Sequence, residues 1–169
     1  MRMHRFYGEE AMETLKENPY VLCSALIGGT FAEADTMALE LGMEGGSSKR
    51  IDAALLFELA HNTGNGHCFI PREKLAAATA ELIGVEPEDV NECIGGLIES
   101  GDMKYEEIAG CRACYLPELY EAETNAAENF ARMCRRTFRD KANIAKLLTK
   151  LEAQQGISYA PMQRQTLEL

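Results

Sequence analysis

Apolar residues recur at helical spacing through most of the chain, and glycine or proline interrupts each stretch. In residues 31–41 the apolar positions Phe31, Ala34, Ala38 and Leu41 lie three or four residues apart, which puts them on one face of a helix. The residue before a proline avoids the helical region, and glycine favours the turn that ends a helix. Helices are therefore expected over residues 8–17, 20–26, 31–41, 48–62, 71–84, 86–100, 117–136, 140–155 and 162–169.

Two short segments alternate apolar and polar residues around a glycine turn, which is typical of a β-hairpin. They cover residues 102–108 and 111–116, with Ala109-Gly110 between them, and residues 67–70 are short enough for one more strand. Three helices followed by a hairpin is the order of a winged helix.

These elements predict a mainly α fold in three parts. We expect a helix-hairpin-helix bundle in residues 1–46, then a winged-helix-like subdomain with a small β-hairpin in residues 47–117. Residues 118–169 supply C-terminal helices that form a connector. The segment Gly45-Gly46-Ser47-Ser48 marks the first boundary, because glycine and serine clusters favour a loop.

The charge restricts how this chain can bind nucleic acid. Among 169 residues, 27 are Asp or Glu and 17 are Lys or Arg, so the formal net charge is −10. A phosphate backbone repels such a surface, and any DNA contact must come from a local basic patch. No apolar run approaches the roughly 20 residues of a membrane helix, and residues 1–8 lack the apolar centre of a signal peptide. The six cysteines have no disulfide-scaffold spacing, which favours a reduced, cytoplasmic protein.

Several segments resemble, in order, the N-terminal part of RecD-like DNA helicases, the family of the exodeoxyribonuclease V alpha subunit. The matching segments are Tyr7-Gly8-Glu9-Glu10-Ala11, Asn18-Pro19-Tyr20, Phe31-x-x-Ala34-Asp35-x-x-Ala38-x-x-Leu41-Gly42, Gly66-His67-x-x-Ile70-Pro71-Arg72-Glu73-x-Leu75, Tyr115-Leu116-Pro117-x-Leu119-Tyr120-x-Ala122-Glu123 and Gly156-Ile157-x-Tyr159-x-Pro161-x-Gln163. Members of that family are ATP-dependent enzymes that move 5′ to 3′ along single-stranded DNA. The resemblance therefore implies a role in DNA repair or recombination.

The sequence lacks the loop that such a motor needs. A Gly-x-x-x-x-Gly-Lys-Ser/Thr segment cradles the nucleotide phosphates, and none is present. In the family this loop follows shortly after a glutamine that contacts the adenine base, and Gln163 resembles that glutamine. The resemblance implies that ATP and Mg²⁺ act in a downstream helicase core of a full-length parent. This chain alone is expected to hold no cofactor, metal or catalytic residue and to be no enzyme. The pattern of its last predicted helix breaks off at residue 169, which suggests a truncated piece.

The turn Gly28-Gly29-Thr30 is the first candidate for DNA contact. In DNA-binding helix-hairpin-helix motifs, a Gly-hydrophobic-Gly turn lets backbone amides approach a phosphate. Here Gly28-Gly29-Thr30 stands in that place, so the hydrophobic plug and the second glycine are both lost, and no Lys or Arg lies between Lys16 and Lys49. A DNA contact and a purely structural hairpin both remain open.

The predicted recognition helix, residues 86–100, is a second candidate, but it carries five carboxylates and no Lys or Arg. Such a helix in a DNA groove would be repelled by phosphates. We therefore expect it to contact protein or to be merely structural.

The late basic stretch is the third candidate. Arg132, Arg135, Arg136 and Arg139 are spaced by three or four residues or are adjacent, so they can share one helix face. Between residues 131 and 150 only Asp140 opposes seven positive charges. The stretch either binds DNA or is a solvated face.

Cys111-x-x-Cys114 lacks the second ligand pair of a zinc site, and chance spacing explains it best. Two functions therefore compete. The first is an accessory region that positions DNA and binds single-stranded or junction DNA weakly beside the helicase core. The second is a protein-interaction module that braces the motor or binds a repair partner without touching DNA. Neither involves a membrane.

Overall fold

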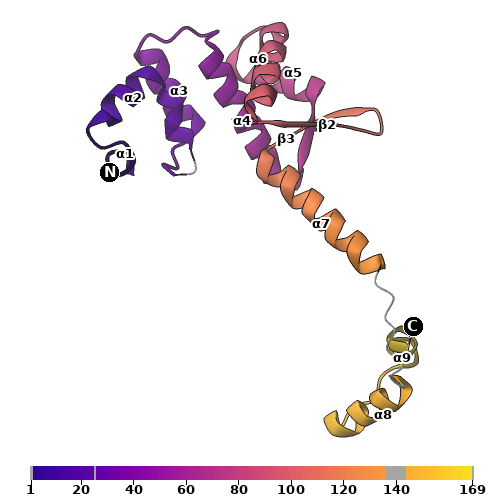
Figure 1. Cartoon of the computed structure of the whole chain (residues 1–169). Helices are drawn as coiled ribbons and strands as arrows, with labels where there is room; N and C mark the ends of the chain where they lie inside the picture. The colour runs from indigo at the N-terminus through magenta and orange to yellow at the C-terminus, as the bar shows by residue number, and fades with distance from the viewer. Residues whose placement is uncertain (1, 25, 136–143, 169) are drawn as a thin grey trace. The chain divides into compact units, whose positions relative to one another are not determined.

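The computed structural model describes residues 2–24, 26–135 and 144–168. The chain divides into two compact units, residues 1–127 and residues 128–169, and each is described by itself. The predicted mainly α class is confirmed: helices dominate, and three short strands form an antiparallel sheet (Figure 1).

The first unit begins with short helices. These are α1 (Arg2–Tyr7), the 3-10 helix η1 (Gly8–Glu10), α2 (Ala11–Glu17), the 3-10 helix η2 (Pro19–Cys23) and α3 (Phe31–Glu40). The sequence pattern missed α1, and it predicted a full helix over residues 20–26 where η2 forms only a tight turn. The Asn18 side chain accepts a hydrogen bond from the Tyr20 amide (3.1 Å) and so caps η2. Ser24 then takes an extended conformation, which ends the turn.

The elements expected in residues 47–117 are present in the predicted order. They are α4 (Ser48–Thr63), β1 (Phe69–Pro71), α5 (Arg72–Ile83), α6 (Pro87–Ser100), β2 (Lys104–Ile108) and β3 (Cys111–Tyr115). The sheet order is β1-β3-β2, with Phe69 opposite Tyr115 and Lys104 opposite the same tyrosine on the other side. Pro71 belongs to β1 rather than to the first turn of α5, because it pairs with Ala113 and its ψ of 135° is extended.

One apolar cluster joins the helices of the first unit to its sheet. It includes Tyr20 and Phe31 from the hairpin region, Leu55 from α4, Ile94 from α6 and Cys114 from β3. The three-part division at residues 46 and 117 stays a prediction, and this cluster contains residues from both sides of the first boundary. Burial of these side chains is the main source of stability for the unit.

The second unit contains the end of α7 (Pro117–Arg135), α8 (Ile144–Gln155) and α9 (Pro161–Glu168). Leu148 is buried in it, and Arg164 forms an ion pair with Glu152 (Nη1–Oε2 2.9 Å) that links α9 to α8. Residues 136–143, including the predicted start of α8, lie outside the described residues. Across the described ranges, no helix combines the length and the apolar character that crossing a membrane requires.

Candidate functional site

Gly28, Gly29 and Thr30 form the hairpin turn between η2 and α3. Gly28 has a φ of +75°, a left-handed conformation that favours glycine. Its amide donates to the Ser24 carbonyl (2.8 Å). Ile27, one residue earlier, is only 8% exposed. The hydrophobic plug that sequence reasoning considered lost is therefore supplied by Ile27.

Gly29 is required by a close approach of two backbone segments. Its amide donates to the Leu22 carbonyl (2.9 Å), and a Cβ at this position would lie 2.9 Å from the same oxygen. Any side chain would collide with the backbone of η2. Gly29 thus closes the hairpin, whatever the hairpin contacts.

Thr30 begins α3 with a reciprocal capping box. Its amide and its hydroxyl both donate to Glu33 Oε2, at 2.9 and 2.8 Å, and the Glu33 amide donates to Thr30 Oγ1 (3.3 Å). Hydrogen bonds from the Thr30 backbone and side chain lower the pKa of Glu33. The amides of Gly28, Gly29 and Thr30 therefore all donate within the chain, and a carboxylate lies where a phosphate would accept them.

A polar network fixes the hairpin region to the rest of the first unit. Arg50 pairs with Asp35 through two hydrogen bonds, Nε–Oδ1 of 2.7 Å and Nη2–Oδ2 of 2.9 Å. Its Nη1 also donates to the carbonyls of Gly45 and Ile83, both at 2.9 Å. The Tyr20 hydroxyl donates to Asp35 Oδ1 (2.7 Å). The network joins η2, α3, α4 and the end of α5.

The ionisation of this network follows from its contacts. Hydrogen bonds from Arg50 lower the pKa of Asp35, so its carboxylate stays charged. Burial, reinforced by the hydrogen bond to Asp35, raises the pKa of Tyr20, which stays neutral. Tyr20 and Asp35 belong to segments that resemble RecD-like helicases, and this resemblance was the one signal for them in the sequence. No sequence pattern pointed to Arg50.

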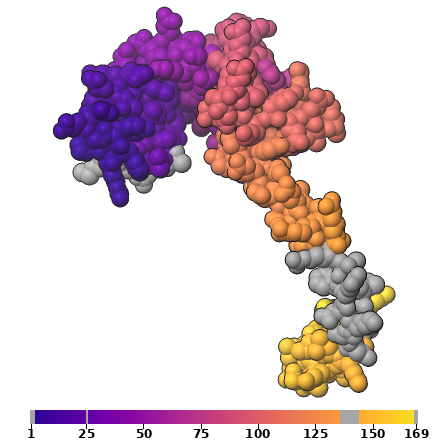
Figure 2. All heavy atoms as spheres, in the orientation of Figure 1, coloured from indigo at the N-terminus to yellow at the C-terminus, as the bar shows by residue number. Residues whose placement is uncertain are grey.

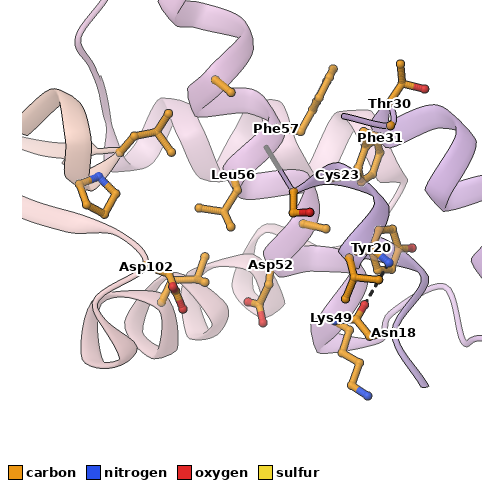
Figure 3. A pocket seen from close by; sticks show the side chains of 18 of the residues that line it. Asn18, Tyr20, Cys23, Thr30, Phe31, Lys49, Asp52, Leu56, Phe57 and Asp102 are labelled. Carbon is orange, nitrogen blue, oxygen red and sulfur yellow. Dashed lines mark hydrogen bonds between the residues drawn. The ribbon is translucent and has the colours of Figure 1, made fainter. Parts of the chain in front are cut away.

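A groove of about 920 Å³ opens beside the hairpin (Figure 3). Its lining comes from η2 and the start of α3, from the exposed side of α4, and from the segments that leave α6 and β3. Apolar side chains such as Leu56, Phe57 and Leu116 form much of the wall, and Asp52, Asp102, Glu118 and Lys49 supply its charges. No sequence pattern indicated this groove.

An aromatic stack runs along one side of the same region. Tyr20, Phe31, Phe57 and His61 follow one another with ring-centroid separations of 6.0, 5.2 and 5.8 Å. Each pair is stacked, so the series joins η2 to α3 and then to α4. The stack holds the hairpin side of the groove against its α4 side.

The structure describes part of the late basic stretch, the third candidate for DNA contact. Arg132 and Arg135 lie in the last turn of α7, and every side chain of residues 121–135 is exposed (orange in Figure 2). Arg132 donates a hydrogen bond to Asn129 Oδ1. Arg136 and Arg139 lie outside the described residues, so their predicted place on the same helix face stays a prediction.

Gln163 lies in the first turn of α9 and is exposed. Its side-chain oxygen accepts a hydrogen bond from the Ala160 amide (3.0 Å), so the glutamine caps its own helix. Contact with an adenine base is a property of the parent that the resemblance implies, and it stays a prediction.

Cys111 and Cys114 are three residues apart in β3, so their side chains point to opposite faces of the sheet. Cys114 is fully buried, and burial raises the pKa of its thiol to about 11. Among the described residues, no group of three or more His, Cys, Asp and Glu side chains is placed to hold a metal ion.

A comparison with known protein families matches the part of the chain that holds the hairpin. Residues 1–69 fit the family described as the ATP-dependent RecD2 DNA helicase HHH domain, where HHH denotes helix-hairpin-helix. The match includes Tyr20, Asp35 and Arg50, whose side chains form the polar network, whereas Ile83, which accepts from Arg50, lies beyond it.

Proposed function

We propose that the chain is a non-catalytic accessory region of a RecD2-like helicase and that it helps to position DNA beside the motor, because residues 1–69 match the helix-hairpin-helix domain of that family. In this proposal the DNA is held by the basic residues that begin at Arg132. The hairpin serves as a structural joint that keeps the first unit rigid.

The separation of charge along the chain carries this proposal. Residues 1–127 contain 9 Lys and Arg against 23 Asp and Glu, whereas residues 128–169 contain 8 against 4. Binding to DNA depends largely on neutralising phosphates with Lys and Arg. The second unit is net positive and the first is strongly negative, so electrostatic attraction to phosphates favours DNA binding by the second unit.

The end of α7 has a surface suited to this role. Arg132 and Arg135 are three residues apart, so they project from the same side of the helix, and both are exposed. Phe130 and Met133 project from the opposite side. Two arginines on one face can contact successive phosphates while the apolar side remains free.

The geometry of the hairpin favours a structural role for it over phosphate binding. A phosphate bound at the start of α3 would have to displace the Glu33 carboxylate from the Thr30 amide and hydroxyl. Lys49, the Lys that lines the groove beside the hairpin, donates instead to the Glu17 carbonyl (2.9 Å). The hairpin amides are thus saturated, and a carboxylate faces any incoming phosphate.

Fluorescence anisotropy with a labelled 20-nucleotide poly(dT) tests the proposal. The variant Arg132→Glu/Arg135→Glu should weaken binding by more than tenfold and flatten the slope of log K against log salt by about 1.4, the value for two lost phosphate contacts. Lys16→Glu/Lys74→Glu is the matched control, since it makes the same charge change at exposed positions of the first unit. Equal losses in both variants would refute a local DNA-binding face.

The acidic helix α6 favours a second candidate function, contact with another protein. Glu88, Asp89, Glu92 and Glu99 are exposed on it, and it carries no Lys or Arg. We infer that the winged-helix-like segment from α4 to β3 uses this helix for a protein and leaves DNA to the second unit. Pull-down by the isolated helicase core of the parent, lost on Glu88→Lys/Glu92→Lys, would support this bracing role.

Nucleotide chemistry belongs, in this proposal, to a helicase core outside residues 1–169. ATP and Mg²⁺ would act there, because the chain has no phosphate-binding Gly-x-x-x-x-Gly-Lys-Ser/Thr loop.

A further inference from the structure

The groove beside the hairpin has a largely apolar wall that its own chain leaves half-covered. Cys23, Ala53, Leu56, Phe57 and Leu116 line it, and each is neither buried nor fully exposed. These side chains pack on the core from one side and face the groove from the other. A ligand that filled the groove would remove this apolar surface from water.

The charges at the groove are mostly negative. Asp52, Asp102 and Glu118 line it, and Lys49 is the cation among its lining residues. Asp52 accepts a hydrogen bond from the Cys93 thiol, and Asp102 accepts one from the Ser100 hydroxyl (2.7 Å). Within the described ranges, none of the three carboxylates forms an ion pair.

Asp52 and Asp102 lie near enough to influence each other. Burial raises the pKa of Asp52, and the negative charge of Asp102 raises it further. Figure 3 shows both carboxylates on the same side of the groove, below Leu56. A cation placed between them would relieve this repulsion, and Lys49 is held away by the Glu17 carbonyl.

We propose that this groove binds a polypeptide segment in which a large apolar side chain is followed by Lys or Arg. The apolar side chain would sit against Leu56 and Phe57, and the basic group would pair with Asp52, Asp102 or Glu118. Complementary charge selects this occupant, because the first unit as a whole is strongly acidic and steers basic partners towards it. The site uses none of the arginines of the DNA-binding proposal.

A nucleic acid fits the groove less well than a basic peptide. Its phosphates would meet three carboxylates, and the amides of Gly28, Gly29 and Thr30 that could grip them already donate within the chain. The strong salt-dependent attraction on which nucleic-acid binding relies would be reversed in sign here.

The probe for the test is a fluorescein-labelled peptide with the sequence Gly-Ser-Leu-Lys-Leu-Arg-Ser-Gly, titrated with the full 169-residue chain. Asp102→Asn/Glu118→Gln should weaken its binding at least about fivefold at low salt. Glu106→Gln/Glu107→Gln removes the same charge from exposed positions of β2, outside the groove, and should weaken it less than about twofold. Ala60→Leu, a substitution at an exposed lining position of α4, should fill the groove and also weaken binding.

Each remaining outcome decides against the site. The proposal fails if the peptide does not saturate, or if both charge pairs cause equal losses. It also fails if a probe with Ser in place of Leu binds as tightly. Poly(dT) affinity that falls in Ala60→Leu would make the groove a nucleic-acid site instead. Thermal unfolding of each variant shows that the fold is intact, and DNA binding through Arg132 and Arg135 is measured separately, so the two proposals can fail independently.

Discussion

Arg50 holds Asp35 with two parallel hydrogen bonds of 2.7 and 2.9 Å, and the two side chains are only 10% and 16% exposed. This bidentate geometry is the strongest form of an arginine–carboxylate contact. The pair connects α3 to α4, and Arg50 continues through its other nitrogen to the carbonyls of Gly45 and Ile83.

Breaking this pair should destabilise the first unit. Arg50→Ala leaves Asp35 as a poorly solvated charge without its partner, so the free energy of unfolding should fall by about 3 kcal/mol, near the lower end for buried pairs. Urea denaturation followed by circular dichroism measures the change. Arg112→Ala is the control, because its ion pair with Glu73 is more than half exposed on both sides and should contribute little. Similar effects from the two substitutions would contradict a structural role for the Asp35–Arg50 pair.

The same pair predicts how stability depends on pH. The pKa of Asp35 is lower in the folded chain than in the unfolded one because Arg50 donates hydrogen bonds to it. Its stabilisation is therefore complete above the unfolded pKa, about 3.9, and is lost as the pH falls through the folded value. Urea titrations at pH 7 and pH 3 should show the gap in unfolding free energy between wild type and Asp35→Asn shrinking in acid. A gap of constant size would show that the carboxylate charge is not what stabilises the fold.

Gly29→Ala should distort the hairpin. The added Cβ would lie 2.9 Å from the Leu22 carbonyl oxygen, and a backbone atom cannot rotate away as a side chain can. The expected loss is about 1–3 kcal/mol. Gly95→Ala is the contrasting change, since it stands in helix α6 with open space around it and should stabilise by about 0.5–1 kcal/mol. Thermal unfolding of both variants tests the contrast, which would be absent if the hairpin could relax.

The chain should not hydrolyse ATP. The sequence has no loop to cradle nucleotide phosphates, and Gln163 uses its side-chain oxygen to cap α9. A coupled assay with Mg²⁺ and saturating poly(dT) should give no turnover above the buffer rate. DNA-stimulated turnover that persists through repurification would contradict the assignment of these residues as non-catalytic.

The sequence predicted those features that depend on local pattern. The apolar spacing of Phe31, Ala34 and Ala38 placed α3 correctly to within a residue, because one buried face dictates that spacing. The turn at Ala109-Gly110 likewise predicted the β2–β3 hairpin. In the structure both residues take a positive φ, as tight hairpin turns often require. The apolar pattern was wrong at η2, where it predicted a helix over residues 20–26. Asn18 and Pro19 favour a tight turn there instead.

The features that hold the candidate site together are not local. Asp35 and Arg50 are 15 residues apart, and Arg50 reaches Ile83 across 33 residues. The groove joins residues as distant as Asn18 and Glu118. The sequence motif has its apolar residue between two glycines. Ile27 precedes both glycines, so the motif did not indicate it. Spacing along a chain does not reveal such contacts, and a family-like segment only marks where they lie.

An NMR titration of the uniformly ¹⁵N-labelled chain with a 20-nucleotide poly(dT) distinguishes DNA binding by the late basic residues from DNA binding by the hairpin. The largest amide shifts should fall on Arg132, Arg135 and the basic residues up to Lys150, and they should decrease as salt is raised. The amides from Gly28 to Glu33 should stay unchanged. The opposite pattern, with the largest shifts from Gly28 to Glu33 and none beyond Arg132, would contradict it.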